Sequence, residues 1–280
     1  MTKYILCLLA IALLFSSQAK AQDSEEDEYF NIKKNKKYAK VFEDKNITFQ
    51  TEKWYVGFEV GGRTPSFKLD NYLNGLLADN ISGDAQLGGY IGYQHQNKWM
   101  AEIGLSKYNF GYGLIVSTFP LGRYYFLSKQ LTVPIRFKYK ILTIGKVIKQ
   151  SGLFLGAGLV NLMPVNAESL GGFNSKIISL GRGTRDSISL KNNTSFAGKF
   201  RTMLEASAEL NIYASKRIDF SIFGRYQLGF SPIVQSEMQY TFNNQPTVFF
   251  QAKTLGSGFN YGFCVKYNYS VKQNYEREGE

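Results

Sequence analysis

The chain has 280 residues and a formal net charge of +11, with 19 tyrosines, 22 phenylalanines and 27 glycines against only 6 prolines. A composition this rich in aromatic residues and this poor in proline is typical of β structure. One histidine and two cysteines leave no His/Cys cluster for a transition metal, which excludes that class of site.

The first 21 residues have the pattern of a signal peptide. Lys3 gives a positive start, residues 5–15 are apolar, and residues 19–21 read Ala-Lys-Ala, which fits an A-x-A cleavage site. The apolar stretch is too short to cross a bilayer as a helix. We therefore expect cleavage after Ala21 and export. Cleavage would leave Cys264 as the only cysteine, so no intramolecular disulfide could form.

Residues 22–53 form a charged leader. The acidic residues Asp23, Glu25, Glu26, Asp27 and Glu28 precede the lysines Lys33, Lys34, Lys36, Lys37 and Lys40. Segregated charge blocks of this kind are usually poorly ordered. We expect a solvated periplasmic tail, with a tether for a partner protein as the alternative.

From Trp54 onward, alternation of apolar and polar residues predicts β-strands. In residues 131–141, Leu, Val, Ile, Phe, Tyr and Ile alternate with Thr, Pro, Arg, Lys and Lys. A period of two places the two sets on opposite faces of a strand, a pattern that no helix can use. The eight predicted strands are residues 54–62, 84–95, 98–108, 131–142, 152–162, 199–213, 217–230 and 258–270.

The connections between these strands alternate in length. The short ones are residues 94–98, 143–151 and 214–216, and the long ones are residues 61–83, 109–130, 164–198 and 231–257. Bacterial outer-membrane barrels have short periplasmic turns and long outer loops, so this parity places both chain ends in the periplasm. Residues 112–126 could instead contain two further strands, so a ten-stranded barrel is the alternative. Residues 272–280 are expected to form a periplasmic tail.

The direction of the polar face decides between a membrane barrel and a soluble one. Arg136, Lys138 and Lys140 share one face of their strand, and each would cost about 2–4 kcal/mol if it met lipid near the midplane. In a membrane this face must therefore point to the lumen. Residues 54–271 thus predict an all-β, antiparallel, up-and-down transmembrane barrel. A soluble, lipocalin-like barrel is the competing interpretation.

Charges of both signs are predicted to face the lumen. They are Glu59, Glu102, Arg136, Lys138, Lys140, Arg201, Glu205, Glu209, Asp219, Arg225 and Lys266. An eight-stranded barrel has room for its side chains and little else. Buried ions need partners, so we expect an ion-pair network that fills the lumen. A narrow, charge-lined conduction path is the alternative.

Two neighbouring strands resemble a known family. LTVPIRFKYKIL (residues 131–142) followed by GLFLGAGLVNLMP (residues 152–164) is similar to the outer membrane β-barrel family of Bacteroidetes-type bacteria, the broad group that includes PorT-like proteins. The likeness covers roughly residues 54–269. It implies an OmpA-like, eight-stranded barrel in the outer membrane, and some members of the family assist type IX secretion. The family supplies no catalytic motif.

Candidate chemistry is sparse. An outer-membrane lipid hydrolase of the His–Ser type needs a base beside its serine, and His95 is the only histidine. His95 is expected in a periplasmic turn, on the wrong side for chemistry in the outer leaflet. We therefore expect no catalytic residues, no cofactor and no metal site. A lipid-modifying enzyme that works without histidine is the least favoured alternative.

The predicted function is that of a non-enzymatic scaffold or interaction protein, for example an accessory to secretion or envelope assembly. A small-solute channel is the second interpretation. The expected partners are outer-membrane lipid and lipopolysaccharide, together with an envelope protein that contacts residues 164–198 or residues 22–53, since loops on rigid scaffolds tend to carry function. The basic excess fits lipopolysaccharide phosphates, or merely solvated turns and paired lumen charges. Nucleic acid is not an expected partner of an exported barrel.

Overall fold

The computed structural model describes residues 47–80, 83–116, 122–144, 151–163, 168–181, 184–196, 201–243 and 245–277. The predicted cleavage site at Ala21 and the charge blocks of the leader lie outside these ranges. Within them, no helix has both the length and the hydropathy needed to cross a membrane.

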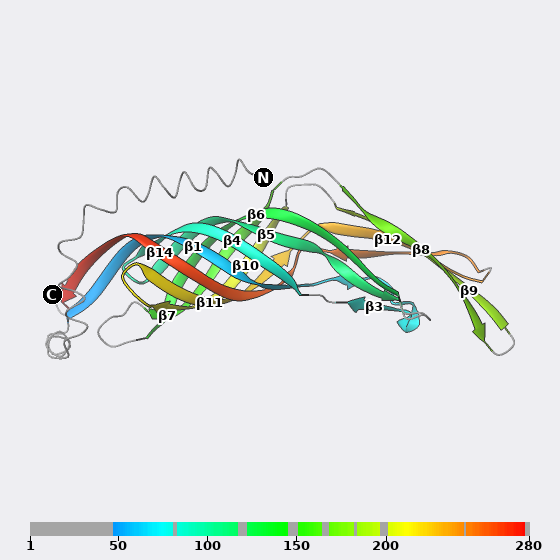
Figure 1. Cartoon of the computed structure of the whole chain (residues 1–280), viewed down its shortest axis with the longest axis horizontal. Coiled ribbons are helices and arrows are strands. Elements are labelled where there is room, and N and C mark those ends of the chain that lie inside the picture. Colours follow the sequence, from blue (N-terminus) through cyan, green and yellow to red (C-terminus); the bar gives the residue numbers. More distant parts are fainter. Residues whose placement is uncertain are drawn as a thin grey trace.

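Eight antiparallel strands close into a barrel (Figure 1). They are β1 (Ile47–Pro65), β4 (Asp84–His95), β5 (Trp99–Val116), β6 (Gly122–Ile144), β7 (Ser151–Leu162), β10 (Arg201–Tyr213), β11 (Ile218–Gly229) and β14 (Gly258–Arg277). Each pairs with the next in this order, and β14 pairs back with β1, so the sheet has no open edge. The predicted eight-stranded up-and-down barrel is confirmed.

The ten-stranded alternative is wrong. Residues 112–116 and 122–126 do not add strands to the barrel but lengthen β5 and β6 beyond it. The two strands pair from Trp99 opposite Tyr139 to Ile103 opposite Ile135, and again from Ser106 opposite Thr132 to Val116 opposite Gly122. The apolar side chains that suggested extra strands have another use. Tyr112, Leu114 and Val116 are buried in an apolar cluster at this end of the molecule.

Three of the long connections, predicted as loops, contribute strands to a second sheet. Its order is β2 (Lys68–Leu69), β13 (Val248–Thr254), β12 (Val234–Phe242), β9 (Thr184–Phe196) and β8 (Glu168–Gly181). We call this five-stranded unit the cap sheet. A short strand, β3 (Leu77–Asn80), pairs with the end of β5 beside the 3-10 turn Leu73–Gly75. Residues 164–198 and 231–257 were predicted as outer loops, and the described parts of these ranges instead form the strands β8, β9, β12 and β13.

The two ends of the barrel differ as the connection lengths predict. The start of β1 and the end of β14 lie at one end, and the cap sheet extends from the other (Figure 1). At the first end, β1 begins at Ile47 and β14 reaches Arg277, and these two residues pair. The predicted boundaries at residues 54 and 271 therefore fall inside strands, and β1 and β14 continue as a paired ribbon.

The barrel is apolar outside and charged inside. On β6, the side chain of Phe137 is 53% exposed whereas its neighbour Arg136 is only 2% exposed. On β1, Phe58 is exposed and Glu59 is buried. A soluble barrel would reverse this distribution, because exposed apolar surface is costly in water and a buried charge costs more still. The outer face is thus suited to hydrocarbon, as in outer-membrane barrels.

The cap sheet follows the ordinary rule of soluble proteins. Its inner face, with Leu190, Met238 and Phe250, packs onto the extended part of β5 and β6 in one apolar cluster. Tyr112 of β5 anchors the contact, since its hydroxyl lies 3.2 Å from Oγ1 of Thr194 on β9. The opposite face of the cap sheet carries polar side chains to solvent.

Candidate functional site

Among the described residues, the buried ion pairs of the lumen form three groups along the barrel. The group nearest the chain ends is a single pair, in which the Nζ of Lys53 donates to Oδ2 of Asp219. Lys53 lies in the range predicted as the leader. It shares the strand parity of Tyr55 and Glu59, which places all three side chains in the interior. That parity is the signal by which the sequence could have identified it.

The second group is built on two lysines and two glutamates. Nζ of Lys138 lies 2.7 Å from Oε2 of Glu102 and also contacts Glu209. Nζ of Lys266 contacts Glu209 and lies 3.9 Å from Oε1 of Glu102. The hydroxyl of Tyr55 donates to Oε1 of Glu102 at 2.9 Å. Each carboxylate is therefore shared by two cations, which offsets the cost of removing four charges from water.

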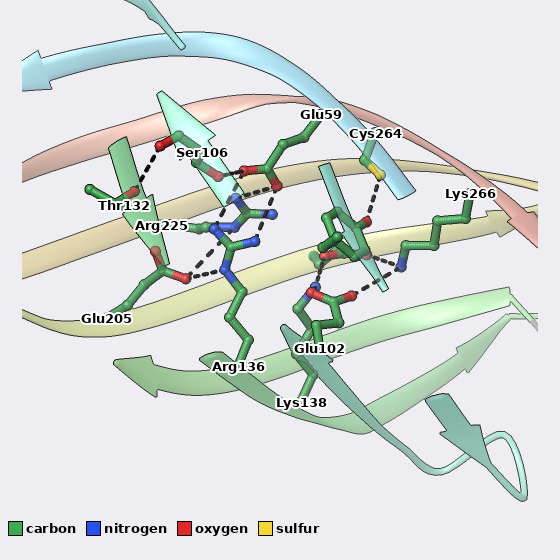
Figure 2. A network of polar contacts seen from close by, with 12 residues as sticks. Glu59, Glu102, Ser106, Thr132, Arg136, Lys138, Glu205, Arg225, Cys264 and Lys266 are labelled. Atoms are coloured by element: carbon green, nitrogen blue, oxygen red, sulfur yellow. Dashed lines mark hydrogen bonds and ion pairs between the residues drawn. The ribbon is translucent and has the colours of Figure 1, made fainter. Parts of the chain in front are cut away.

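The third group pairs two arginines with two glutamates, as Figure 2 shows. Nη1 of Arg136 lies 3.2 Å from Oε2 of Glu59, and its Nε lies 2.7 Å from Oε1 of Glu205. Nη1 of Arg225 lies 2.8 Å from the same Oε2 of Glu59. Gln227 donates to the second oxygen of Glu205 at 3.1 Å. The planar guanidinium groups bridge strands on different sides of the barrel and so cross-link its wall.

The structure brings most of the predicted lumen charges into this network. Glu59, Glu102, Arg136, Lys138, Glu205, Glu209, Asp219, Arg225 and Lys266 are all buried and ion-paired. The other two are only half-buried. Lys140 lies beside the ring of Phe154, next to a bulge in β6, and its charge interacts with those of Lys53 and Asp219. Arg201 is half-buried at the first residue of β10 and forms no ion pair with any described residue.

Arg63 is a buried cation that the sequence analysis missed. Its Nη2 donates to the backbone oxygen of Gly256 at 2.6 Å, and its Nη1 donates to that of Asn109 at 3.3 Å. The guanidinium carbon lies 4.8 Å from the centre of the Phe110 ring. Within the described ranges Arg63 forms no ion pair. It ties the wall of the barrel to the segment that leads from β13 into β14, so it connects barrel and cap.

A cluster of buried apolar side chains lies at the end of the barrel beneath the cap sheet. Phe110, Met203 and Ile233 belong to the same buried cluster as the inner face of the cap. A Cβ added to Gly256 would meet the side chains of Ile233 and Met203 at 2.3 and 2.7 Å, so this turn lies tightly against the cluster. From the chain ends toward the cap, the interior therefore contains three groups of paired charges and then an apolar cluster.

His95 and Cys264 carry no evident chemistry. Nδ1 of His95 lies 3.1 Å from Oε1 of Glu52 and 3.3 Å from the hydroxyl of Tyr93, at the end of β4 beside the short turn. Cys264 is buried in the lumen, with its Sγ 2.6 Å from the hydroxyl of Tyr90. Among the described residues, no group of three or more His, Cys, Asp or Glu side chains could hold a metal ion.

No family model matches the chain, and no curated protein matches it. Among solved structures, it is similar to the outer membrane protein OprG from Pseudomonas aeruginosa, at 14% identity and a TM-score of 0.43, covering 78% of this chain and 95% of that one. It is also similar to the outer membrane protein AlkL in DMPC bilayers (11%, TM-score 0.29, 79% and 90% covered). The outer membrane protease OmpT from Escherichia coli is a third (9%, TM-score 0.31, 80% and 96%).

At these identities and TM-scores, nothing about the activities of those proteins carries over to this chain. The class of molecule follows from its own geometry. The closed sheet, the apolar exterior and the charged interior together make an outer-membrane-type β-barrel.

Proposed function

We propose that the protein is a non-enzymatic scaffold of the outer membrane, in which a filled barrel serves as the anchor and the cap sheet as the interacting part. The observation that carries the proposal is the set of buried ion pairs in the interior. Three groups of paired charges cross the lumen, and an apolar cluster follows them beneath the cap. An anchor needs no open path, whereas a pore does.

The ion pairs are costly to open. Removing one partner of a buried pair typically costs about 3–5 kcal/mol, because the other charge is left without compensation. A solute crossing the lumen would have to displace Arg136 and Arg225 from the shared carboxylate of Glu59. The network therefore favours a static barrel over a conducting one.

Partners and chemistry follow from the same arrangement. Outer-membrane lipid would cover the apolar belt, and lipopolysaccharide phosphates would find basic side chains. An envelope protein would contact the β8–β9 hairpin, which lies within residues 164–198, or the leader of residues 22–53. The position of His95 beside the short turn supports the expectation that the protein is not an enzyme. We also propose that the protein belongs to the Bacteroidetes-type outer membrane β-barrel family and acts as an accessory to secretion.

Conductance of the purified mature protein in planar lipid bilayers tests the proposal. We expect a flat current trace after insertion, with a general porin in the same bilayers as the positive control. Insertion is verified by the heat-dependent shift in electrophoretic mobility that folded barrels show. Reproducible current steps from the wild-type protein would contradict a filled anchor.

One observation favours a small channel as the second candidate. Several buried amide side chains of the lumen, among them Gln86, Gln94, Asn211 and Asn260, have no hydrogen-bond partner within the described part of the chain. Buried amides without protein partners are commonly hydrated, so they would suit a narrow wet path. The same bilayer experiment decides, since such a path would give small, cation- or anion-selective steps.

A further inference from the structure

The solvent-facing side of the cap sheet contains a polar groove. Its volume is about 460 Å³, and its lining includes Gly172 and Asn174 of β8, Lys191 and Asn193 of β9, and Glu237 and Gln239 of β12. This volume lies within the range of about 300–1,000 Å³ that small-molecule sites usually have. Such sites are mostly lined by apolar side chains. This groove is polar instead, so its ligand should be rich in hydrogen-bonding groups.

The strand register arranges these side chains in two parallel rows. In the first row Asn174 lies opposite Lys191, Lys191 opposite Gln239, and Gln239 opposite Phe249 of β13. In the second row Gly172, Asn193 and Glu237 lie opposite one another in turn. Directly opposed residues of antiparallel strands project from the same face. Each row therefore crosses the strands, with about 4.8 Å between successive positions.

An exposed aromatic ring stands at the end of the first row. Phe249 is 71% exposed, although it lies on the cap and not on the apolar belt of the barrel. Gly172 contributes to the hollow, because it has no side chain and a Cβ there would meet the backbone oxygen of Asn192 at 2.0 Å. Phe249 does not line the groove itself but lies one strand beyond Gln239, so its ring is an apolar platform next to the groove. Gly172 gives the groove a floor that larger residues could not form.

The polar groups of the groove are not engaged with one another. In the part of the chain that the structure describes, the side chains of Asn174, Lys191, Asn193, Glu237 and Gln239 form no hydrogen bond or ion pair. Amide side chains offer both donors and acceptors, Lys191 adds donors and Glu237 adds acceptors. One positive and one negative charge also leave the groove without net charge.

We propose that this groove binds a neutral oligosaccharide. Sugar hydroxyl groups both donate and accept hydrogen bonds, as the amides require, and the apolar face of a pyranose ring can stack on an exposed aromatic ring such as Phe249. The strand spacing is close to the rise of one sugar unit in an extended chain, so a chain lying along a row meets one strand per sugar. The inference rests on the proposed function, in which the cap sheet is the interacting part.

A peptide fits the groove less well. Peptides that bind sheets usually add a strand at a free edge, where backbone groups are unpaired. The groove instead lies on the face of the sheet, where β9 is paired on both sides, with β8 and with β12. The backbone of β9, at the centre of the groove, has no hydrogen bonds left to give, so recognition there must use side chains.

Titration calorimetry of the purified mature protein in detergent tests the proposal. The probes are linear oligosaccharides of glucose, mannose and galactose and, in a separate arm, the polysaccharide of the producing bacterium's own lipopolysaccharide. We expect saturable binding in at least one arm, and the arm that binds identifies the source of the sugar. N193A and F249A should each weaken binding about tenfold, the usual size of one lost hydrogen bond or stacking contact.

V248A is the matched control. Val248 is the neighbour of Phe249 on β13 and is also exposed, but it projects from the opposite face, so its truncation should leave the affinity unchanged. The proposal is overturned if no oligosaccharide binds, if a peptide or protein binds there and sugars do not, or if N193A and F249A bind as wild type. Bilayer conductance is measured independently, so failure of sugar binding and failure of the filled-barrel proposal remain distinguishable.

Discussion

The barrel and the cap sheet are both built from strands in which apolar and polar residues alternate. The barrel buries the polar residues, whereas the cap sheet buries the apolar ones. In the barrel the charged side chains of β6 face inward and the apolar ones face out. In the cap, Leu190 and Phe196 of β9 are buried, whereas Lys191 and Asn193 are exposed. The period of two fixes which residues share a face. The medium, hydrocarbon around the barrel and water around the cap, decides which face is outermost.

Loss of a lumen carboxylate should have the largest effect. Glu209 contacts both Lys138 and Lys266, so E209A leaves two buried cations that depend on Glu102 alone. We expect a loss of about 3–5 kcal/mol in the free energy of unfolding, measured by urea titration in detergent. On the cap, E237A should change it by less than about 0.5 kcal/mol, because Glu237 is exposed. Equal effects of the two variants would contradict the buried network.

A cation introduced on the outer face of the barrel should have the second largest effect, and the same cation on the cap sheet should have almost none. Ile135 lies on the apolar belt of β6, so I135R should destabilise the barrel by about 2–4 kcal/mol in lipid. F249R introduces the same cation at an exposed position of the cap sheet, and it should leave the stability almost unchanged. The yield of folded protein in phospholipid vesicles, read from heat-modifiable mobility, measures both. If I135R inserts as well as F249R, the belt does not face lipid.

Substitution of Arg63, which connects the barrel to the cap sheet, should give the smallest loss of stability of the three. R63M removes the hydrogen bonds to the backbone oxygens of Gly256 and Asn109, which should cost about 1–3 kcal/mol. The loss should appear as faster amide hydrogen exchange in β12 and β13 and little change in β1 and β14 away from residue 63. R201M is the control, since Arg201 forms no ion pair with described residues. Uniformly faster exchange in R63M would mean that Arg63 supports the whole barrel.

Most of the barrel could be predicted from sequence because each strand repeats the same local signal. The predicted strand at residues 131–142 lies wholly inside β6, and its inward-facing Arg136 and Lys138 lie in the network. The errors occur where that signal is interrupted. Gly61 and Gly62 ended the predicted first strand before Arg63, and the charge blocks of the leader obscured Lys53. Glycines and charge blocks usually mark strand ends, and here β1 continues through both positions.

The cap was missed for a different physical reason. Residues 188–196 and 234–242 also alternate, but they fall in connections that were predicted as long outer loops. Their strands depend on contacts distant in sequence, such as Tyr112 of β5 beside Thr194 of β9. The polar groove depends on the register of three strands as well, and no local pattern contains a register.

The sequence by itself determined the barrel class, the faces of the predicted barrel strands and the charges that must avoid lipid, because these follow from a local period and from the cost of charge in hydrocarbon. Only the tertiary structure decided which lysine meets which glutamate, that the long connections pair into a cap, and that Asn174, Lys191, Gln239 and Phe249 form one row. Those outcomes depend on closure and register, which bring together residues far apart in the chain.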